Sequence, residues 1–419
     1  MAGEVNLNVS INKAHLPVTG GQQLSYVLID ARPTAVVANV QMPLNFALVL
    51  DHSGSMEGDK LHSMKEAAKI AVGQMGPQDH VSVIIFDDQV TTIAPNQPAT
   101  DKPGILHEID RIRARGGTEM SKGMRSGLDE LRKALGSDRL SRMLVLTDGQ
   151  TFGDENLCQQ LGTEAGAEGV SIIALGLGDD WNEELLDGMA QASGGVSDFI
   201  QDPATITQFF QRTVQAAQSA VVQNAEMVLR LVSGVAPRQV WQVVPMISNL
   251  GYSPLSDRDV QVHLGELDKE QGKSVLVELL LPARQEGRYR MAQAEVSYDV
   301  PTTGVVGEKA KTDVVISFTS DANLSQQYDA HVMNLVEKVT AFKLQTRALD
   351  EAAAGNIAGA TQKLRAAATR LLNMGEAELA ETFSAEADQL EQSGQMSAAG
   401  TKKLRYETRK LTQKPPETE

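Results

Sequence analysis

The chain has 419 residues, and this length predicts roughly two to four domains. Hydrophobic residues make up 42% of the sequence and charged residues 22%, which is typical of a globular protein and excludes fibrous, disordered and membrane-embedded classes. The formal net charge of -16, from 54 acidic and 38 basic residues, argues against a broad basic surface for nucleic acid.

The first segment, residues 1–42, alternates between apolar and polar side chains. The alternation covers Val5–Ile11 and Leu24–Ile29, and a period of two places one set of side chains on each face of a strand. Gly20 and Gly21 are typical of a turn between two strands. We therefore expect half-buried β-strands in this segment.

Residues 43–220 differ because their apolar runs are nearly continuous. Such runs indicate strands that are buried on both faces, as in a parallel sheet covered by helices. We predict a doubly wound (Rossmann-like) α/β domain, which binds ligands at the carboxyl ends of its strands. The predicted strands are Asn45–Leu50, Val81–Phe86, Met143–Thr147 and Val170–Gly176.

Residues 221–320 return to alternation, with glycines recurring between the runs, and this spacing predicts a β-sandwich. The strands of residues 1–42 need partners, because an isolated hairpin is only marginally stable in water. We predict that they pair with strands of residues 221–320. The α/β domain would then be inserted into one β-sandwich, as is possible when the two ends of a domain lie close together.

The last segment, residues 321–419, shows apolar residues at helical spacing and predicts a C-terminal helical domain. Gly355, Gly375 and Gly394 fall where helices are expected to end. The final residues, PPETE, are expected to form a frayed tail.

The cellular location is predicted from cysteine usage and from the first residues. Cys158 is the single cysteine, which favours a reducing compartment. The first fifteen residues lack the basic start and apolar core of a secretory signal. No apolar run approaches the ~20 residues of a membrane-spanning helix. We expect a cytoplasmic protein without a membrane span.

Oxygen-bearing side chains gather at the predicted ligand-binding edge of the α/β domain. Asp51, Ser53 and Ser55 follow its first strand at alternate positions. This pattern alone is also explained by an Asx-turn without metal. Thr118 adds a hydroxyl in a glycine-flanked loop, and Asp148 ends another buried strand. Hard oxygen donors of this kind favour Mg²⁺, with Mn²⁺ and Ca²⁺ as alternatives.

Asp51-x-Ser53-x-Ser55, Thr118 and Asp148, in this order and at strand ends, resemble the metal-ion-dependent adhesion site (MIDAS) of von Willebrand factor A (VWA) domains. The architecture resembles that of cytoplasmic bacterial VWA proteins. The resemblance implies that the three hydroxyls ligate the metal directly and the two aspartates directly or through water.

The same resemblance implies a metal-dependent protein–protein interaction module or scaffold and not an enzyme. A hard cation with mostly neutral ligands stays electrophilic and accepts an Asp or Glu from a partner as its final ligand. By analogy with the family, an AAA+ ATPase or a signalling protein is a candidate partner.

Two alternative functions stay open. In a self-assembling structural protein, an acidic residue of one molecule would complete the metal site of the next. A metal-dependent hydrolase would instead use the cation to activate water. It needs a general base beside the metal, and only Glu119 or His52 could serve. We expect Glu119 to point away as a helix N-terminal charge and His52 to lie exposed at the rim of the site.

Overall fold

The computed structural model describes residues 3–38, 42–151 and 153–413. The chain forms two compact units, residues 1–40 with 220–419 and residues 41–219. The second unit therefore interrupts the first in the sequence. Within the described ranges, no helix is long and apolar enough to cross a membrane.

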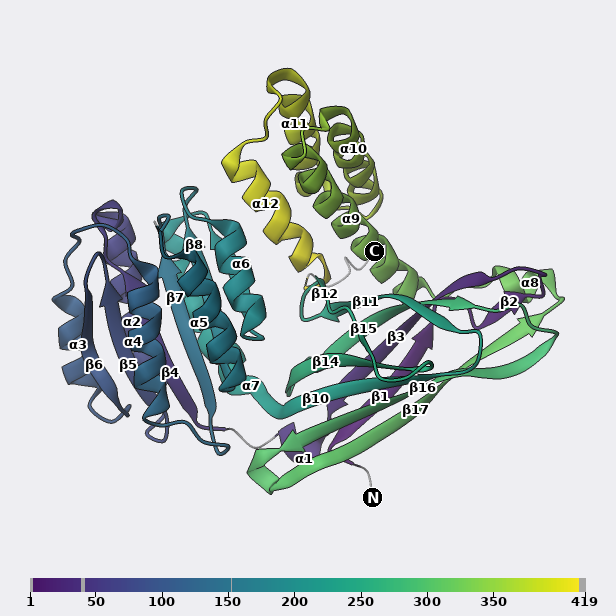
Figure 1. The fold of residues 1–419 in the computed structure, drawn as a ribbon, viewed down its shortest axis with the longest axis horizontal. Coiled ribbons are helices and arrows are strands. Elements are labelled where there is room, and N and C mark those ends of the chain that lie inside the picture. Colours follow the sequence, from purple (N-terminus) through teal and green to yellow (C-terminus); the bar gives the residue numbers. More distant parts are fainter. Residues whose placement is uncertain (1–2, 39–41, 152, 414–419) are drawn as a thin grey trace. The chain divides into compact units, whose positions relative to one another are not determined.

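The unit of residues 41–219 is built on a six-stranded sheet in the order β6-β5-β4-β7-β8-β9 (Figure 1). All neighbouring strands are parallel except β6, which is antiparallel to β5. Every residue of β4 and β7 is buried, which explains why their central runs, Phe46–Leu50 and Met143–Leu146, are continuously apolar. The order reverses between β4 and β7, the position where doubly wound sheets bind ligands. The strands are β4 (Leu44–Asp51), β5 (His80–Phe86), β6 (Val90–Pro98), β7 (Leu140–Thr147), β8 (Val170–Leu177) and β9 (Val196–Ile200).

The helices of this unit pack on the sheet and on one another. Helix α4 lies against β4 and β5, and two glycines allow this close approach. A Cβ at Gly123 would lie 2.7 Å from Phe86 Cδ1, and one at Gly127 would lie 2.6 Å from Val49 Cγ2. The helices are α2 (Asp59–Gln74), α3 (Lys102–Asp110), α4 (Met120–Arg132), α5 (Glu155–Ala167), α6 (Glu183–Ala192) and α7 (Ile206–Ser219), with short 3-10 turns η1 (Gly54–Met56) and η2 (Pro203–Thr205).

The other unit contains a β-sandwich of two sheets. One has the order β1-β3-β15-β11-β12 and the other the order β13-β14-β10-β16-β17-β2. Strand β3 pairs with β15, and β2 pairs with β17. Each sheet therefore combines strands that precede the inserted unit in the sequence with strands that follow it. The strands are β1 (Val5–Ile11), β2 (His15–Pro17), β3 (Gln23–Pro33), β10 (Ala220–Leu231), β11 (Ala236–Val244), β12 (Ser248–Asn249), β13 (Ser253–Pro254), β14 (Asp259–Asp268), β15 (Lys273–Leu281), β16 (Gly287–Val300) and β17 (Val305–Thr319).

Two apolar cores stabilise this unit. The first lies between the sheets and includes Ile29, Val277 and Leu229. The second joins Leu28 and Trp241 of the five-stranded sheet to the C-terminal helices, so these helices cover the outer face of that sheet. The helices of the unit are α1 (Ala35–Ala38), α8 (Ala322–Gln326), α9 (Ala330–Ala353), α10 (Ile357–Asn373), α11 (Ala377–Ser393) and α12 (Ala398–Arg409), with 3-10 turns η3 (Pro301–Thr303) and η4 (Lys410–Thr412). The predicted fold class, an α/β domain within a β-sandwich followed by a helical domain, is confirmed. The predicted PPETE tail lies outside the described residues.

Candidate metal centre

Asp51 is the last residue of β4, and its carboxylate is fully buried. The Ser53 backbone N–H donates to Asp51 Oδ1 over 2.8 Å, and the Thr147 hydroxyl donates to Asp51 Oδ2 over 2.6 Å. Burial raises the pKa of Asp51 above its ordinary value, although the hydrogen bonds from Thr147 and Ser53 act in the opposite direction. Both carboxylate oxygens are thus held in place by neutral donors.

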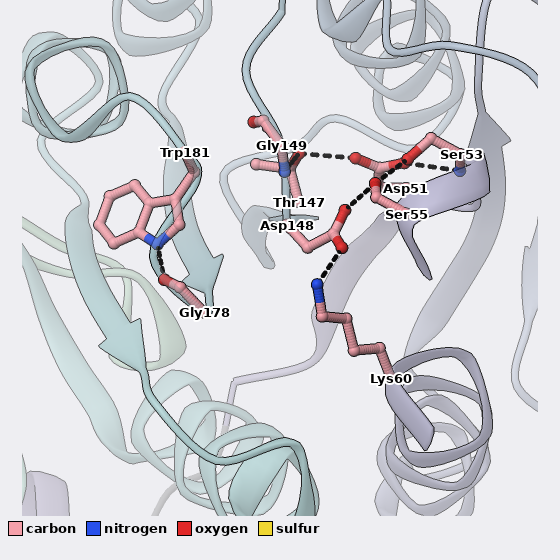
Figure 2. Close-up of polar contacts among 9 residues, drawn as sticks. All are labelled: Asp51, Ser53, Ser55, Lys60, Thr147, Asp148, Gly149, Gly178 and Trp181. Carbon is pink, nitrogen blue, oxygen red and sulfur yellow. Dashed lines mark hydrogen bonds and ion pairs between the residues drawn. The ribbon is translucent and has the colours of Figure 1, made fainter. Parts of the chain in front are cut away.

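The two serine hydroxyls connect β4 to the residue after β7 (Figure 2). Ser53 Oγ and Ser55 Oγ are 3.1 Å apart, and the Ser55 hydroxyl donates to Asp148 Oδ1 over 2.7 Å. Asp148 is buried, whereas Ser55 is exposed. The site therefore has a buried anionic floor and a hydroxyl that reaches solvent.

Thr118 belongs to the loop before α4, which main-chain hydrogen bonds join to the loop after β4. The Gly54 N–H donates to the carbonyl oxygen of Gly116 over 3.1 Å. A Cβ added at Gly149 would lie 3.6 Å from Thr118 Oγ1 and 3.9 Å from Ser55 Oγ. The Thr118 and Ser55 hydroxyls therefore flank Gly149, and the structure brings all five predicted residues to one edge of the sheet.

Two of the oxygen pairs have a spacing that would also suit neighbouring ligands of one small cation. Mg²⁺ binds oxygen at about 2.1 Å, so adjacent ligand oxygens are about 3 Å apart. The Ser53–Ser55 and Ser55–Asp148 oxygen pairs, at 3.1 and 2.7 Å, match that spacing. Within the described ranges, no group of three or more His, Cys, Asp or Glu side chains could hold a metal. A centre in this structure therefore depends on hydroxyls as well as carboxylates.

Two residues that the sequence analysis did not single out contact the aspartates. Thr147, expected only as a strand end, binds Asp51. Lys60, in the first turn of α2, places its ammonium nitrogen 2.5 Å from Asp148 Oδ2. A polar residue at the end of an apolar strand was the available signal for Thr147. No comparable signal existed for Lys60, because a lysine at a helix start is ordinarily solvated.

Asp87, directly after β5, holds the surrounding loops together. Its Oδ1 accepts the Gln89 N–H over 2.6 Å, and its Oδ2 accepts Arg115 Nε over 2.9 Å. Although burial acts to raise it, the pKa of Asp87 is lowered by the Gln89 N–H and by the nearby His52 and Arg115 side chains. Asp87 therefore links the strand end to the loop that carries Thr118.

The expected exposure of His52 is wrong, because its side chain is buried at 3% exposure. Its Nδ1 lies 2.8 Å from the carbonyl oxygen of Arg113, and its Nε2 lies 3.7 Å from Asp87 Oδ2. The ring thus fills the space between two loops. Glu119 precedes α4 and forms an ion pair of 2.6 Å with Lys122, as expected for a carboxylate directed to its own helix.

Comparisons with known proteins identify the α/β unit. Residues 45–212 match the von Willebrand factor type A domain family, and the sheet order and strand-end site belong to that same segment. The chain contains a VWA domain. Residues 330–414 match a second family, described as the Sll0103-like, C-terminal alpha-helical domain.

Relatives of known sequence differ in how much of the chain they share. The uncharacterized protein sll0103 of Synechocystis is 32% identical over 272 residues, which is 63% of this chain and 63% of that protein. The human inter-alpha-trypsin inhibitor heavy chain H4 is 27% identical over 199 residues, which is 43% of this chain and 21% of the heavy chain. The chain thus spans less than two thirds of either relative.

Two solved structures share the fold over almost the whole chain. A von Willebrand factor type A protein from Catenulispora acidiphila superposes with a TM-score of 0.76 at 18% identity, covering 96% of each chain. The ArnB paralog VWA2 from Sulfolobus acidocaldarius gives a TM-score of 0.55 at 16% identity, covering 97% of this chain and 98% of its own. A VWA domain combined with the same surrounding architecture therefore occurs in other proteins.

Proposed function

We propose that this protein is a divalent-metal-dependent interaction module whose VWA domain binds an acidic side chain of a partner. The observation that supports it best is the spacing of the Ser53, Ser55 and Asp148 oxygens, which suits neighbouring ligands of one small cation. Ser53, Ser55 and Thr118 would bind Mg²⁺, or Mn²⁺ or Ca²⁺ in its place. Asp148 and Asp51 would bind it directly or through water.

The residues have separate tasks in this proposal. The bound cation supplies a Lewis acid that accepts a carboxylate oxygen from the partner. Thr147 and the Ser53 N–H hold Asp51 in one orientation. Asp87 and Arg115 hold the loop with Thr118 near the serines. The exposed position of Ser55 leaves that side of the site accessible to a partner.

A hydrolase is the weaker candidate, because one proposed base is buried and the other is engaged by a lysine of its own helix. His52 is buried against Arg113 and Asp87, and Glu119 is paired with Lys122. Self-assembly uses the same chemistry as partner binding. It differs only in that a second copy of this chain, and not another protein, supplies the carboxylate. A cytoplasmic location, and an AAA+ ATPase or a signalling protein as the partner, remain part of the proposal.

The test compares the wild type with the double variant Ser53→Ala/Ser55→Ala, each with Mg²⁺ and with EDTA. Isothermal titration with Mg²⁺ measures metal binding, and pull-down measures partner binding. We expect both to be lost in the variant, and partner binding to be lost in EDTA. Light scattering of the purified protein detects self-assembly that EDTA reverses. Partners that persist in EDTA and in the variant would contradict the proposal.

A further inference from the structure

Lys60 makes a contact that the metal chemistry does not require. Its ammonium group lies 2.5 Å from Asp148 Oδ2, while the Ser55 hydroxyl occupies Asp148 Oδ1. Figure 2 shows the lysine side chain extending from α2 directly to this carboxylate. The Asp148 side chain has 0% exposure and that of Lys60 has 31%. A partly exposed cation therefore reaches a buried anion from the solvent side.

The charges of the two aspartates are compensated differently. Asp51 receives its hydrogen bonds from Ser53 and Thr147, which carry no charge. Asp148 forms an ion pair with Lys60, and no other ion pair to either aspartate occurs within the described ranges. A buried carboxylate without a counterion destabilises a fold strongly. Lys60 is therefore the group that compensates the charge of Asp148 when the site holds no metal.

A divalent ion at the site would need the same carboxylate. An ammonium group and a dication that share Asp148 repel each other, and this repulsion weakens metal binding. Lysine is suited to this role because its charge sits at the end of a flexible chain that can withdraw into water.

We propose that Lys60 is a tethered cation that competes with the divalent ion for Asp148 and thereby sets the metal affinity of the site. The inference rests on the proposed metal site. Because Lys60 holds Asp148 Oδ2 while Oδ1 lies beside Ser55, the competition is electrostatic, and a bound cation weakens the ion pair between Lys60 and Asp148. The site would then bind metal more weakly than the same oxygen ligands would without Lys60.

The test uses the full chain and Mn²⁺, whose free concentration is measured by electron paramagnetic resonance. Lys60→Met and Lys60→Gln should bind Mn²⁺ on the order of tenfold more tightly than the wild type. The same variants should melt at a lower temperature in EDTA, because Asp148 loses its counterion. A merely structural lysine would not produce this pair of opposite effects, tighter metal binding and a less stable metal-free protein.

Lys69→Met is the matched control, because Lys69 lies on the same helix and pairs with Glu66 and Asp110, each at 2.6 Å. It removes the same charge and should leave Mn²⁺ affinity unchanged. Equal or weaker binding by both Lys60 variants, with normal binding by the wild type, would overturn the role of Lys60 and leave the metal site intact. If the wild type itself binds no Mn²⁺ or Mg²⁺, the metal site and the Lys60 inference both fail.

Discussion

At the scale of single residues, the hydroxyl of Thr147 keeps a buried charge in place. Asp51 Oδ2 accepts this hydroxyl at 2.6 Å, and the carboxylate is fully buried. Valine has almost the same shape as threonine but no hydroxyl, so Thr147→Val leaves a buried carboxylate oxygen without its donor. We expect a loss of about 1–3 kcal/mol in the free energy of unfolding.

Urea unfolding at neutral pH in EDTA measures this loss without a contribution from metal. Thr147→Ser keeps the hydroxyl and is the control, so it should lose clearly less stability than the valine variant. Equal stability of the valine variant and the wild type would mean that Asp51 is satisfied by other groups.

The limits of sequence-based prediction are clearest for these residues. Asp51, Ser53 and Ser55 could be predicted as a group because strand and turn geometry brings alternate positions to one side. Asp148 follows a strand end that the doubly wound order brings beside β4. Thr118 lies in the loop between α3 and α4, and only the resemblance to the MIDAS pattern pointed to it. Lys60 could not be predicted, because its long side chain can reach several acids. Which of the five residues ligate a metal stays a prediction.

At the scale of elements, main-chain hydrogen bonds join the loop after β4, the end of β5 and the loop before α4. The His52 N–H donates to the carbonyl oxygen of Phe86 over 3.0 Å. The Arg115 N–H donates to the carbonyl oxygen of His52 over 2.8 Å, and the Glu119 N–H donates to that of Asp87 over 2.8 Å. The ends of β4 and β5 and the start of α4 therefore form one connected framework.

Asp87 is the side chain at the centre of this framework, so we treat it as a positioning residue. Asp87→Ala removes the contacts to Gln89 and Arg115 without changing any proposed ligand. Asp87 contacts no proposed ligand and acts through the loop. We therefore expect Mn²⁺ affinity to fall by about tenfold, the lower end of the range for lost outer-shell partners.

Asp88→Ala is the matched control, because Asp88 is the exposed neighbour of Asp87. It should leave the affinity for Mn²⁺ close to that of the wild type. If the two variants weaken binding equally, the effect is one of charge near the site, and the positioning role of Asp87 is wrong.

In the β-sandwich, the pairing of β16 with β17 creates a pH-dependent contact. Glu295 is buried on β16, and Lys311 lies opposite it, with Lys309 nearby at 2.9 Å. Hydrogen bonds from the two lysines lower the pKa of Glu295 to about 2. A lowered carboxyl pKa adds stability above the pKa of the unfolded chain, about 4.3 for glutamate, and this stability is lost as the pH falls toward 2.

Glu295→Gln should therefore reduce stability at neutral pH and lessen the loss of stability between about pH 4.5 and 2. The measurement is the free energy of unfolding of the wild type and the variant across this range. Two curves that stay parallel over the whole range would show that Glu295 does not titrate differently in the folded protein.

At the scale of the whole chain, burial on one face or on two explains which elements could be predicted. The strands in which apolar and polar residues alternate lie in the sandwich. The strands with continuous apolar runs lie in the VWA sheet, which helices cover. The run Val275–Leu281 on β15 is apolar except for Glu278, which pairs with Lys343 of α9, because Val277 faces the sandwich core while Leu276 faces the helices. The packing of the C-terminal helices on this sheet could not be predicted, because their sequence shows an apolar stripe without showing what the stripe packs against. The exact boundaries after residues 42, 220 and 320 stay a prediction.

The interrupted first unit predicts that its two chain segments cannot fold separately. Strand β3 lies between β1 and β15, and Ile29 is in the sandwich core while Leu28 is in the helical core. Deleting residues 1–40 removes β1, β2 and β3, and with β3 the side chains of Ile29 and Leu28 from the two cores. We expect the remaining sandwich to lose its cooperative unfolding transition in urea and its near-ultraviolet circular dichroism. A folded, cooperative sandwich without residues 1–40 would show that β3 is dispensable.

The fragment of residues 42–219 contains every proposed metal ligand and a complete sheet, so it should fold alone and bind Mn²⁺ as the full chain does. A fragment that fails to fold would show that the VWA domain depends on the unit into which it is inserted.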